Sequence, residues 1–197
     1  MNEDMSALQI IGLPKLPEVR PGDDMVGMIG DAIDESGNGL RVDDVLVVTQ
    51  KIVSKAEGQL VDLRTVEPSA FALDFAEQWD KDPRQVEMVL RESKRIVRMD
   101  HGVLITETRH GFVCANSGVD ASNVEADTVC LLPVDPDSSA QAMRDGLGER
   151  LGVKPGVIVS DSFGRPWRVG IVNVAIGVAG MAALIDYRGQ YDDAGYE

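Results

Sequence analysis

The stretch VLVVTQKIVSKAEG, residues 45–58, changes character at Thr49. Residues 45–49 form a short apolar run rich in β-branched side chains, which predicts a buried strand. Polar residues follow at once, and Lys51 and Lys55 share a face if a helical turn begins there. Strand ends commonly hold ligands, and lysine is a good point charge for phosphate. A solvated basic turn explains the same residues equally well, so both interpretations stay open.

Turn residues and apolar spacing divide the rest of the chain into short elements. Helices are expected over residues 68–80, from Asp82-Pro83 to about 98, and from a cap at Ser138 or Ser139 to about 151. Strands are expected over residues 103–106, 111–114, 128–132 and 156–160, the last ending on Asp161. The small apolar residues 175–183 show no clear period, and we expect them to pack against another backbone, inside the subunit or across an interface.

Strands and helices alternate irregularly along the chain, and several strand pairs are typical of hairpins. We therefore expect an α+β fold with irregular mixed and antiparallel sheets rather than a regular doubly wound sheet. A length of 197 residues suits one domain or two small ones. Because no Pro/Ser-rich linker divides the chain, we treat residues 1–197 as one domain.

Composition excludes several classes of function. The chain has 33 acidic and 19 basic residues, a formal net charge of -14, which argues against a nucleic-acid partner. It lacks an apolar run long enough to span a membrane, and its first residues are too acidic for a secretory signal. Two cysteines suit a reducing cytosol, so we expect a cytoplasmic protein.

Three more polar segments attract attention beside residues 49–58. Gly12–Lys15 with residues 21–24 suits backbone amides that hold a nucleotide, or a plain N-terminal turn. Asp120 and Asn123 stand in a loop of small residues that suits a cation and a phosphate or ribose, or an Asx-turn. The segment SDSFGRPWR, residues 160–168, combines Asp161 and the Ser162 hydroxyl with two arginines. A surface turn is the weaker interpretation of that last segment.

These residue types together indicate metal-assisted phosphoryl chemistry on an anionic substrate. The chain has no P-loop, no Rossmann glycine fingerprint and no metal-spaced Cys/His cluster. His101 and His110 are isolated and are expected in surface turns. The five basic and two acidic residues of 84–98 give a local charge of +3, which we expect to help such a protein hold anions.

Several long motifs occur in fixed order: GLP…PGDD, VVTQKIVSKAEG, ETRHGFVCANSGVDASNV, LLPVDPD, SDSFGRPWR and AIGVAG. They closely resemble the coenzyme F420:L-glutamate ligase family, also called F420-0:γ-glutamyl ligase or CofE, from about residue 11 to 195. The resemblance implies a CofE-like α+β fold, a homodimer, and a GTP-dependent ligase that adds L-glutamate to the deazaflavin precursor F420-0. It further implies a requirement for Mg²⁺ or Mn²⁺ and an effect of K⁺.

The resemblance also assigns residues. GTP contacts are expected at Leu13, Pro14, Lys15, Leu16, Gln50, Lys55 and Asn123. Metal ligands are expected at Asp120, Asp161 and Ser162, where Ser162 stands in place of a threonine that many members carry. Asp161, Lys55 and Arg165 are the candidates for catalysis. Chemistry alone, and not the family, suggests that Arg165 and Arg168 hold a carboxylate or the phosphodiester of the precursor.

The expected reaction starts with attack of the acceptor carboxylate on the GTP γ-phosphate, and the glutamate amine then displaces phosphate from the acyl phosphate. Family members usually continue beyond the motif at 186–195, so we expect a C-terminal segment of the family to lie outside this chain.

Two alternative functions stay open. One is a non-catalytic nucleotide- or metal-binding fragment, and the other is a ligase of the family acting on another acceptor.

Overall fold

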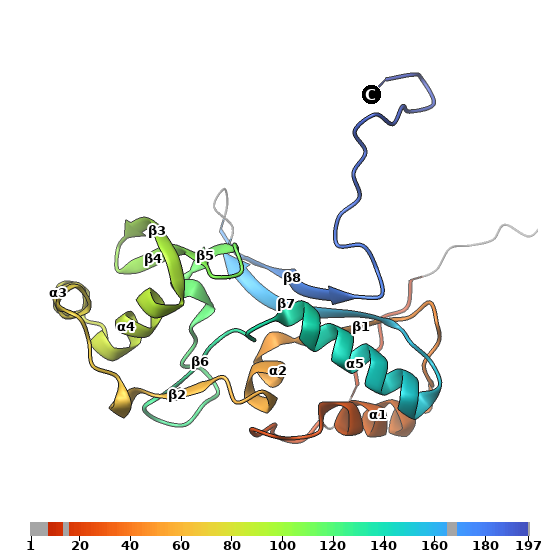
Figure 1. Ribbon diagram of the computed structural model, residues 1–197, viewed down its shortest axis with the longest axis horizontal. Helices are drawn as coiled ribbons and strands as arrows, with labels where there is room; N and C mark the ends of the chain where they lie inside the picture. Colours follow the sequence, from red (N-terminus) through yellow and green to blue (C-terminus); the bar gives the residue numbers. More distant parts are fainter. Residues whose placement is uncertain (1–7, 14–15, 165–168, 197) are drawn as a thin grey trace, which may run out of the picture.

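A three-stranded sheet organises one half of the molecule. The computed structural model describes residues 8–13, 16–164 and 169–196. Strand β7 (Gly156–Gly164) lies between β1 (Val45–Thr49), which is parallel to it, and β8 (Ile171–Ala179), which is antiparallel. Helix α2 (Gln50–Ala56) follows β1 without a loop. Helix α5 (Pro136–Leu151) packs on β7 and β8, and α1 (Met25–Ser36) packs on α5 (Figure 1).

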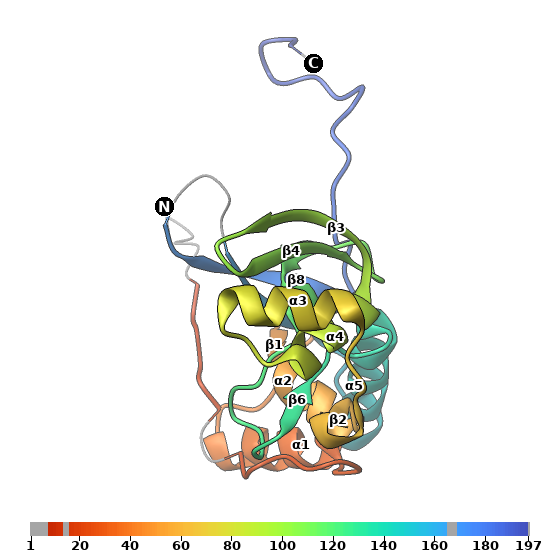
Figure 2. The same ribbon diagram turned by 90° about the vertical axis from the view of Figure 1, so that its left-hand side faces the viewer.

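The other half contains two smaller antiparallel sheets and two helices. Strand β2 (Leu60–Asp62) pairs with β6 (Thr128–Cys130), and β4 (Val103–Thr108) lies between β3 (Ser93–Asp100) and β5 (Val113–Ala115). Helices α3 (Ala70–Trp79) and α4 (Pro83–Glu92) pack together beside β3 and β4 (Figure 2). Short 3₁₀ turns, η1 (Leu63–Thr65) and η2 (Asn116–Gly118), complete the described elements.

Each half has its own hydrophobic core. One core gathers Ile29, Val53, Leu147 and Val159 from α1, α2, α5 and β7. The other gathers Phe75, Val89, Leu104 and Val129 from α3, α4, β4 and β6. The expected α+β fold with mixed and antiparallel sheets is thus confirmed. No helix in the described ranges is both long and apolar enough to cross a bilayer.

The helix expected to end near Arg98 ends at Glu92, so that prediction is wrong. Asp82 caps the helix as expected, with its carboxylate accepting the Arg84 backbone N–H at 2.8 Å. Residues 93–100 instead form β3, which pairs with β4 along its length. The pairing partner lies in a different segment, so the apolar spacing of the helix could not reveal where it stops.

Two other boundaries differ from expectation. Helix α5 starts at Pro136 because Asp135, rather than Ser138 or Ser139, is its cap and accepts the Ser138 backbone N–H at 3.0 Å. Strand β7 does not end before Asp161 but continues to Gly164, since β8 supplies a partner for these polar residues. Residues 175–179 pack inside the subunit, which confirms one of the two expectations for this stretch.

Candidate active site

The β1–α2 junction brings the residues of one predicted segment against β7. Thr49 on β1 is in register with Ser160 on β7, so Gln50 starts α2 at the level of Asp161. Gln50 is buried, and its side-chain amide lies close enough to Asp161 to hydrogen-bond it. Parallel strands place their carboxyl ends at the same edge of a sheet. The polar ends of β1 and the middle of β7 therefore form one side of the site.

Asp120 approaches this site from the loop after η2. Its backbone forms an isolated bridge with Cys130, next to β6. The Lys51 ammonium pairs with Asp120 Oδ2 and also donates to the carbonyl and hydroxyl oxygens of Ser122, at 3.0 and 2.7 Å. Asp120 Oδ1 accepts the Ser122 backbone N–H at 2.7 Å, which is the Asx-turn that composition suggested. The same residue thus makes a local turn and a long-range ion pair.

Electrostatics separate the two carboxylates. Burial raises the pKa of Asp161, and the charge of Asp120 raises it further, against hydrogen bonds from Ser162 N–H and Gln50. Burial also opposes the charge on Asp120, but hydrogen bonds from Lys51 and Ser122 together outweigh it and lower the pKa of Asp120. Asp120 is therefore the stably ionised member, while Asp161 lacks a full counter-charge.

Buried thiols border the site without taking part in it. Burial and the nearby charge of Asp161 raise the pKa of the Cys114 thiol to about 11. Burial likewise raises the pKa of Cys130. Since the thiolate is the reactive form, both cysteines are inert packing residues at neutral pH.

Ser162 is not brought together with Asp161 in this structure. Successive side chains on a strand point to opposite faces, and β7 is regular at these two residues. The Ser162 hydroxyl is exposed and donates to Asn173 Oδ1 on β8 at 2.8 Å. Its role as a metal ligand beside Asp161 stays a prediction from the resemblance.

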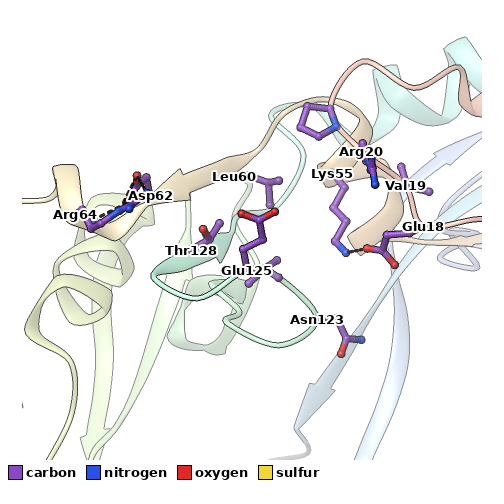
Figure 3. A pocket seen from close by; sticks show the side chains of 12 residues that line it. Glu18, Val19, Arg20, Lys55, Leu60, Asp62, Arg64, Asn123, Glu125 and Thr128 are labelled. Atoms are coloured by element: carbon purple, nitrogen blue, oxygen red, sulfur yellow. Dashed lines mark hydrogen bonds and ion pairs between the residues drawn. The ribbon is translucent and has the colours of Figure 1, made fainter.

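A pocket of about 880 Å³ opens beside this cluster (Figure 3). Lys55 and Asn123, two predicted nucleotide contacts, both line it, together with Arg20, Asp62 and Arg64. Lys55 is buried, and its ammonium pairs with the exposed carboxylate of Glu18, which lies beside it in the pocket lining. A pocket of this size with a buried cation suits an anionic ligand of nucleotide size.

Other predicted residues lie elsewhere. Leu13 is half-buried and lines a separate hollow of about 150 Å³ beside β1, and Leu16 is half-buried outside both pockets. Pro14, Lys15, Arg165 and Arg168 lie outside the described residues. His101 is exposed in a turn as expected, whereas His110 is half-buried with Nε2 2.9 Å from the Pro133 carbonyl oxygen.

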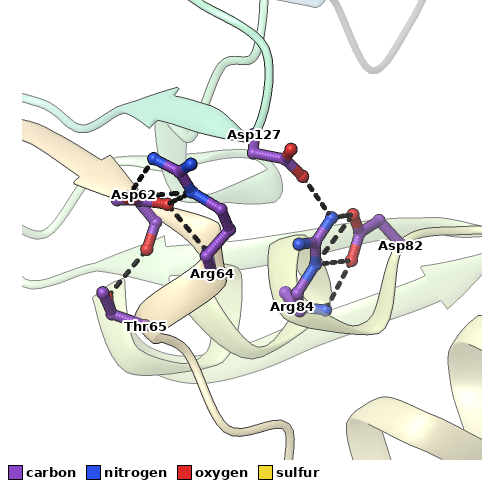
Figure 4. Close-up of polar contacts among 6 residues, drawn as sticks. All are labelled: Asp62, Arg64, Thr65, Asp82, Arg84 and Asp127. Atoms are coloured by element: carbon purple, nitrogen blue, oxygen red, sulfur yellow. Dashed lines mark hydrogen bonds and ion pairs between the residues drawn. The ribbon is translucent and has the colours of Figure 1, made fainter.

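The basic stretch 84–98 does not offer a free cationic surface, so that expectation is wrong. Arg84 contacts Asp82 and Asp127, which come from two segments (Figure 4). The other basic side chains of the stretch pair with acids in the same way: Arg91 with Glu87, Lys94 and Arg95 with Glu107, and Arg98 with Asp100. A charge count over residues 84–98 does not include Asp127 and Glu107, because these two acids come close to the basic side chains only in the folded protein.

The carboxylates suit a hard cation, although within residues 8–13, 16–164 and 169–196 no three His, Cys, Asp or Glu side chains gather into a metal cluster. Asp120 and Asp161 offer the oxygen ligands that Mg²⁺ or Mn²⁺ takes from proteins, and Mg²⁺ usually needs only one or two carboxylates besides phosphate and water. The Lys51 ammonium already places a positive charge against the Asp120 carboxylate, where a cation would also bind. The donor set therefore fits a divalent ion.

Sequence reasoning missed Glu18 and Ser122. Glu18 carries no motif that ties it to Lys55, which is 37 residues away in the sequence. Ser122 had a usable signal, since a serine two residues after an aspartate is typical of an Asx-turn.

Comparison with known proteins identifies the family of this chain. A family model described as F420-0:Gamma-glutamyl ligase matches residues 14–197. The chain belongs to this family. Proteins named Coenzyme F420:L-glutamate ligase are similar to it: that of Methanothermobacter thermautotrophicus is 45% identical, over 94% of this chain and 73% of the relative.

Two further relatives of the same name agree. That of Methanopyrus kandleri is 47% identical over 98% of this chain and 75% of its own length. That of Methanocaldococcus jannaschii is 40% identical over 100% of this chain and 77% of its own length. The chain thus spans about three quarters of these members of the F420-0:gamma-glutamyl ligase family, and the family expected from the motifs is confirmed.

Proposed function

We propose that this chain is a GTP-dependent ligase that joins the amino group of L-glutamate to a carboxyl group of F420-0 and then adds further glutamate through γ-linkages. The observation that carries the proposal is the meeting of Lys51, Asp120 and Asp161 beside a pocket lined by Lys55 and Asn123. Family membership and the names of the relatives supply the substrates. This ligase would act in coenzyme F420 biosynthesis.

The pocket would hold GTP. Lys55 supplies a buried positive charge for a phosphate, and Asn123 supplies an amide that suits a ribose or phosphate oxygen. When nucleotide binds, the Lys55 ammonium would leave Glu18 and pair with a phosphate, because a phosphate competes for an ammonium more strongly than an exposed carboxylate does. Leu13, Pro14, Lys15, Leu16 and Gln50 are the remaining nucleotide contacts of the proposal.

Amide formation needs an activated carboxyl group, because a carboxylate and an amine do not condense in water unaided. In the proposed route a carboxylate oxygen of F420-0 attacks the γ-phosphorus, and the bond from that phosphorus to the β–γ bridging oxygen breaks, releasing GDP. The neutral amine of glutamate then attacks the acyl carbon. Phosphate leaves, and the nitrogen loses its proton. Positioning and charge neutralisation are the main tasks left to the protein.

Asp120 and Asp161, with Ser162 as a third candidate, would hold Mg²⁺ or Mn²⁺. When bound, the ion would supply positive charge for the γ-phosphate. K⁺ is a further candidate effector, Arg165 and Arg168 are candidate holders of the acceptor, and a cytoplasmic homodimer is the proposed form. The two carboxylates favour catalysis over a fragment that merely binds nucleotide, because binding alone does not need them.

The test mixes protein, GTP, Mn²⁺ or Mg²⁺, L-glutamate and F420-0, and follows GDP release and product mass. We expect GDP release to depend on both glutamate and F420-0, and Asp161→Ala to abolish it. GDP release that ignores both substrates would sink the ligase proposal. GDP release that needs glutamate and a different carboxylic acid would favour the alternative acceptor.

A further inference from the structure

The Lys51 ammonium lies in a cage of hard oxygen atoms. Its Nζ contacts the Asp120 carboxylate, the Ser122 carbonyl oxygen at 3.0 Å and the Ser122 hydroxyl oxygen at 2.7 Å. The lysine side chain is only 17% exposed. A carboxylate, a carbonyl and a hydroxyl are also ligands that a hard metal cation takes. The ammonium thus stands where a small cation would find suitable donors.

The contacts of Asp120 leave little room for a second cation. Oδ2 accepts both Lys51 Nζ and the Ser122 hydroxyl, the latter at 2.8 Å, which uses both of its lone pairs. Oδ1 already accepts the Ser122 backbone N–H at 2.7 Å. An ammonium and a divalent ion on one carboxylate also repel each other, and this repulsion is strong in a partly buried site.

We infer that Lys51 is a positioning residue that serves as the internal counter-ion of Asp120 and competes with the divalent cation for this carboxylate. The inference rests on the proposed function, because it takes Asp120 as a cation ligand. Lysine has a flexible four-carbon stem, so its ammonium can leave Asp120 when the cation arrives. Without the cation, Lys51 keeps the Asp120 loop in place.

The first measurement is Mn²⁺ affinity by titration calorimetry on the whole chain without nucleotide. Removing the competitor in Lys51→Met should tighten Mn²⁺ binding by about three- to tenfold, the scale set by a charged hydrogen bond in a partly exposed pair. Lys51→Arg, which keeps the charge, should stay within about twofold of the parent chain. The matched control is Lys154→Met, because Lys154 forms a surface pair with Asp145 and should leave affinity unchanged.

The second measurement needs no substitution. Lysine acetylation by an N-hydroxysuccinimide ester, mapped by mass spectrometry, reports how accessible each ammonium is. Mn²⁺ should increase the labelling rate of Lys51 by about threefold or more as the ammonium leaves its cage, a change comparable to the affinity effect. Lys154 should label at the same rate with and without Mn²⁺. A purely structural lysine would show no Mn²⁺ dependence.

Weaker Mn²⁺ binding by Lys51→Met, or slower labelling of Lys51 with Mn²⁺, would overturn the inference, because Lys51 would then support the cation. Failure of both the parent chain and Lys51→Met to bind Mn²⁺ would overturn it too. An Asp161→Asn chain separates this result from the proposed metal site. If Asp161→Asn binds Mn²⁺ like the parent while Lys51→Met binds more tightly, the competition stands and only the assignment of Asp161 fails.

Discussion

Asp120 and Cys130 form an isolated antiparallel bridge in which each backbone N–H donates to the other's carbonyl oxygen, at 3.0 and 2.8 Å. Cys130 is fully buried on β6, so the bridge fixes the backbone of Asp120 to the interior of the protein. Asp120 itself stays partly exposed, with 40% of its side chain accessible. A rigid backbone with an accessible carboxylate is what a preorganised ligand residue needs.

Asp161→Asn should make the protein more stable at pH 7 while removing the proposed activity. Burial raises the pKa of Asp161 in the folded protein above its value in the unfolded chain. At a pH above both values, the ionised carboxylate is therefore less favourable in the folded than in the unfolded chain, and a neutral side chain avoids this cost. Allowing for solvent screening of this partly exposed group, we expect the melting temperature to rise by about 1 to 3 °C. Thermal unfolding followed by circular dichroism measures the shift.

The pH dependence provides the control for Asp161. The parent chain loses stability as pH rises through the raised pKa of Asp161. It regains this stability as pH falls, because Asp161 is then neutral in the parent chain as well. The difference between Asp161→Asn and the parent should therefore shrink in acid. A constant or growing difference at low pH would contradict a charge-based effect.

Lys55→Met should weaken nucleotide binding by about tenfold or more, because it removes the buried positive charge of the pocket. Glu18→Gln is the matched variant. It removes the partner of Lys55 without removing the ammonium, so affinity should stay equal or increase. Titration with a fluorescent GDP analogue measures both. Equal losses in the two variants would show that their ion pair, rather than the Lys55 charge, shapes the pocket.

Arg84→Met should lower the free energy of unfolding measurably without changing nucleotide affinity. The Arg84 Nη2 atom lies 2.6 Å from Asp82 Oδ2 and 2.8 Å from Asp127 Oδ1, so it ties α4 to the loop before β6. The control is Arg64→Met, whose exposed pair with Asp62 joins residues two apart in the chain and should contribute less than the Arg84 contacts. Urea unfolding measures both, and the opposite order would contradict the structural role.

Gly177→Ala should destabilise the fold by about 2 to 3 kcal/mol. A Cβ atom at Gly177 would stand 2.3 Å from the carbonyl oxygen of Pro136, where α5 begins, and backbone on both sides cannot yield cheaply. Gly164→Ala is the control, because no atom of the described residues lies within 4 Å of the position that its methyl group would take, so its stability should hardly change. Similar unfolding curves for both variants would contradict the close packing of α5 on β8.

The sequence alone identified β1, the cap at Asp82 and the α+β class, because these depend on local spacing and hydrogen bonds near in the chain. It also identified the family, since the order of several long motifs is written in the sequence itself. It placed the end of α4 wrongly, because β3 exists only through pairing with β4. It likewise described residues 84–98 as a cationic stretch, because a count of charges along the chain does not include acids that pair with them in the fold.

Tertiary structure alone decided which polar residues meet. It joined Lys51 to Asp120 over 69 residues and Lys55 to Glu18 over 37, and it neutralised the basic stretch with Asp127 and Glu107. Such pairs depend on how strands β1, β6 and β7 are arranged in space, which no local spacing encodes. A residue's type and its neighbours in the chain set what chemistry it can do, whereas charge, burial and partners act through space and are set by the fold.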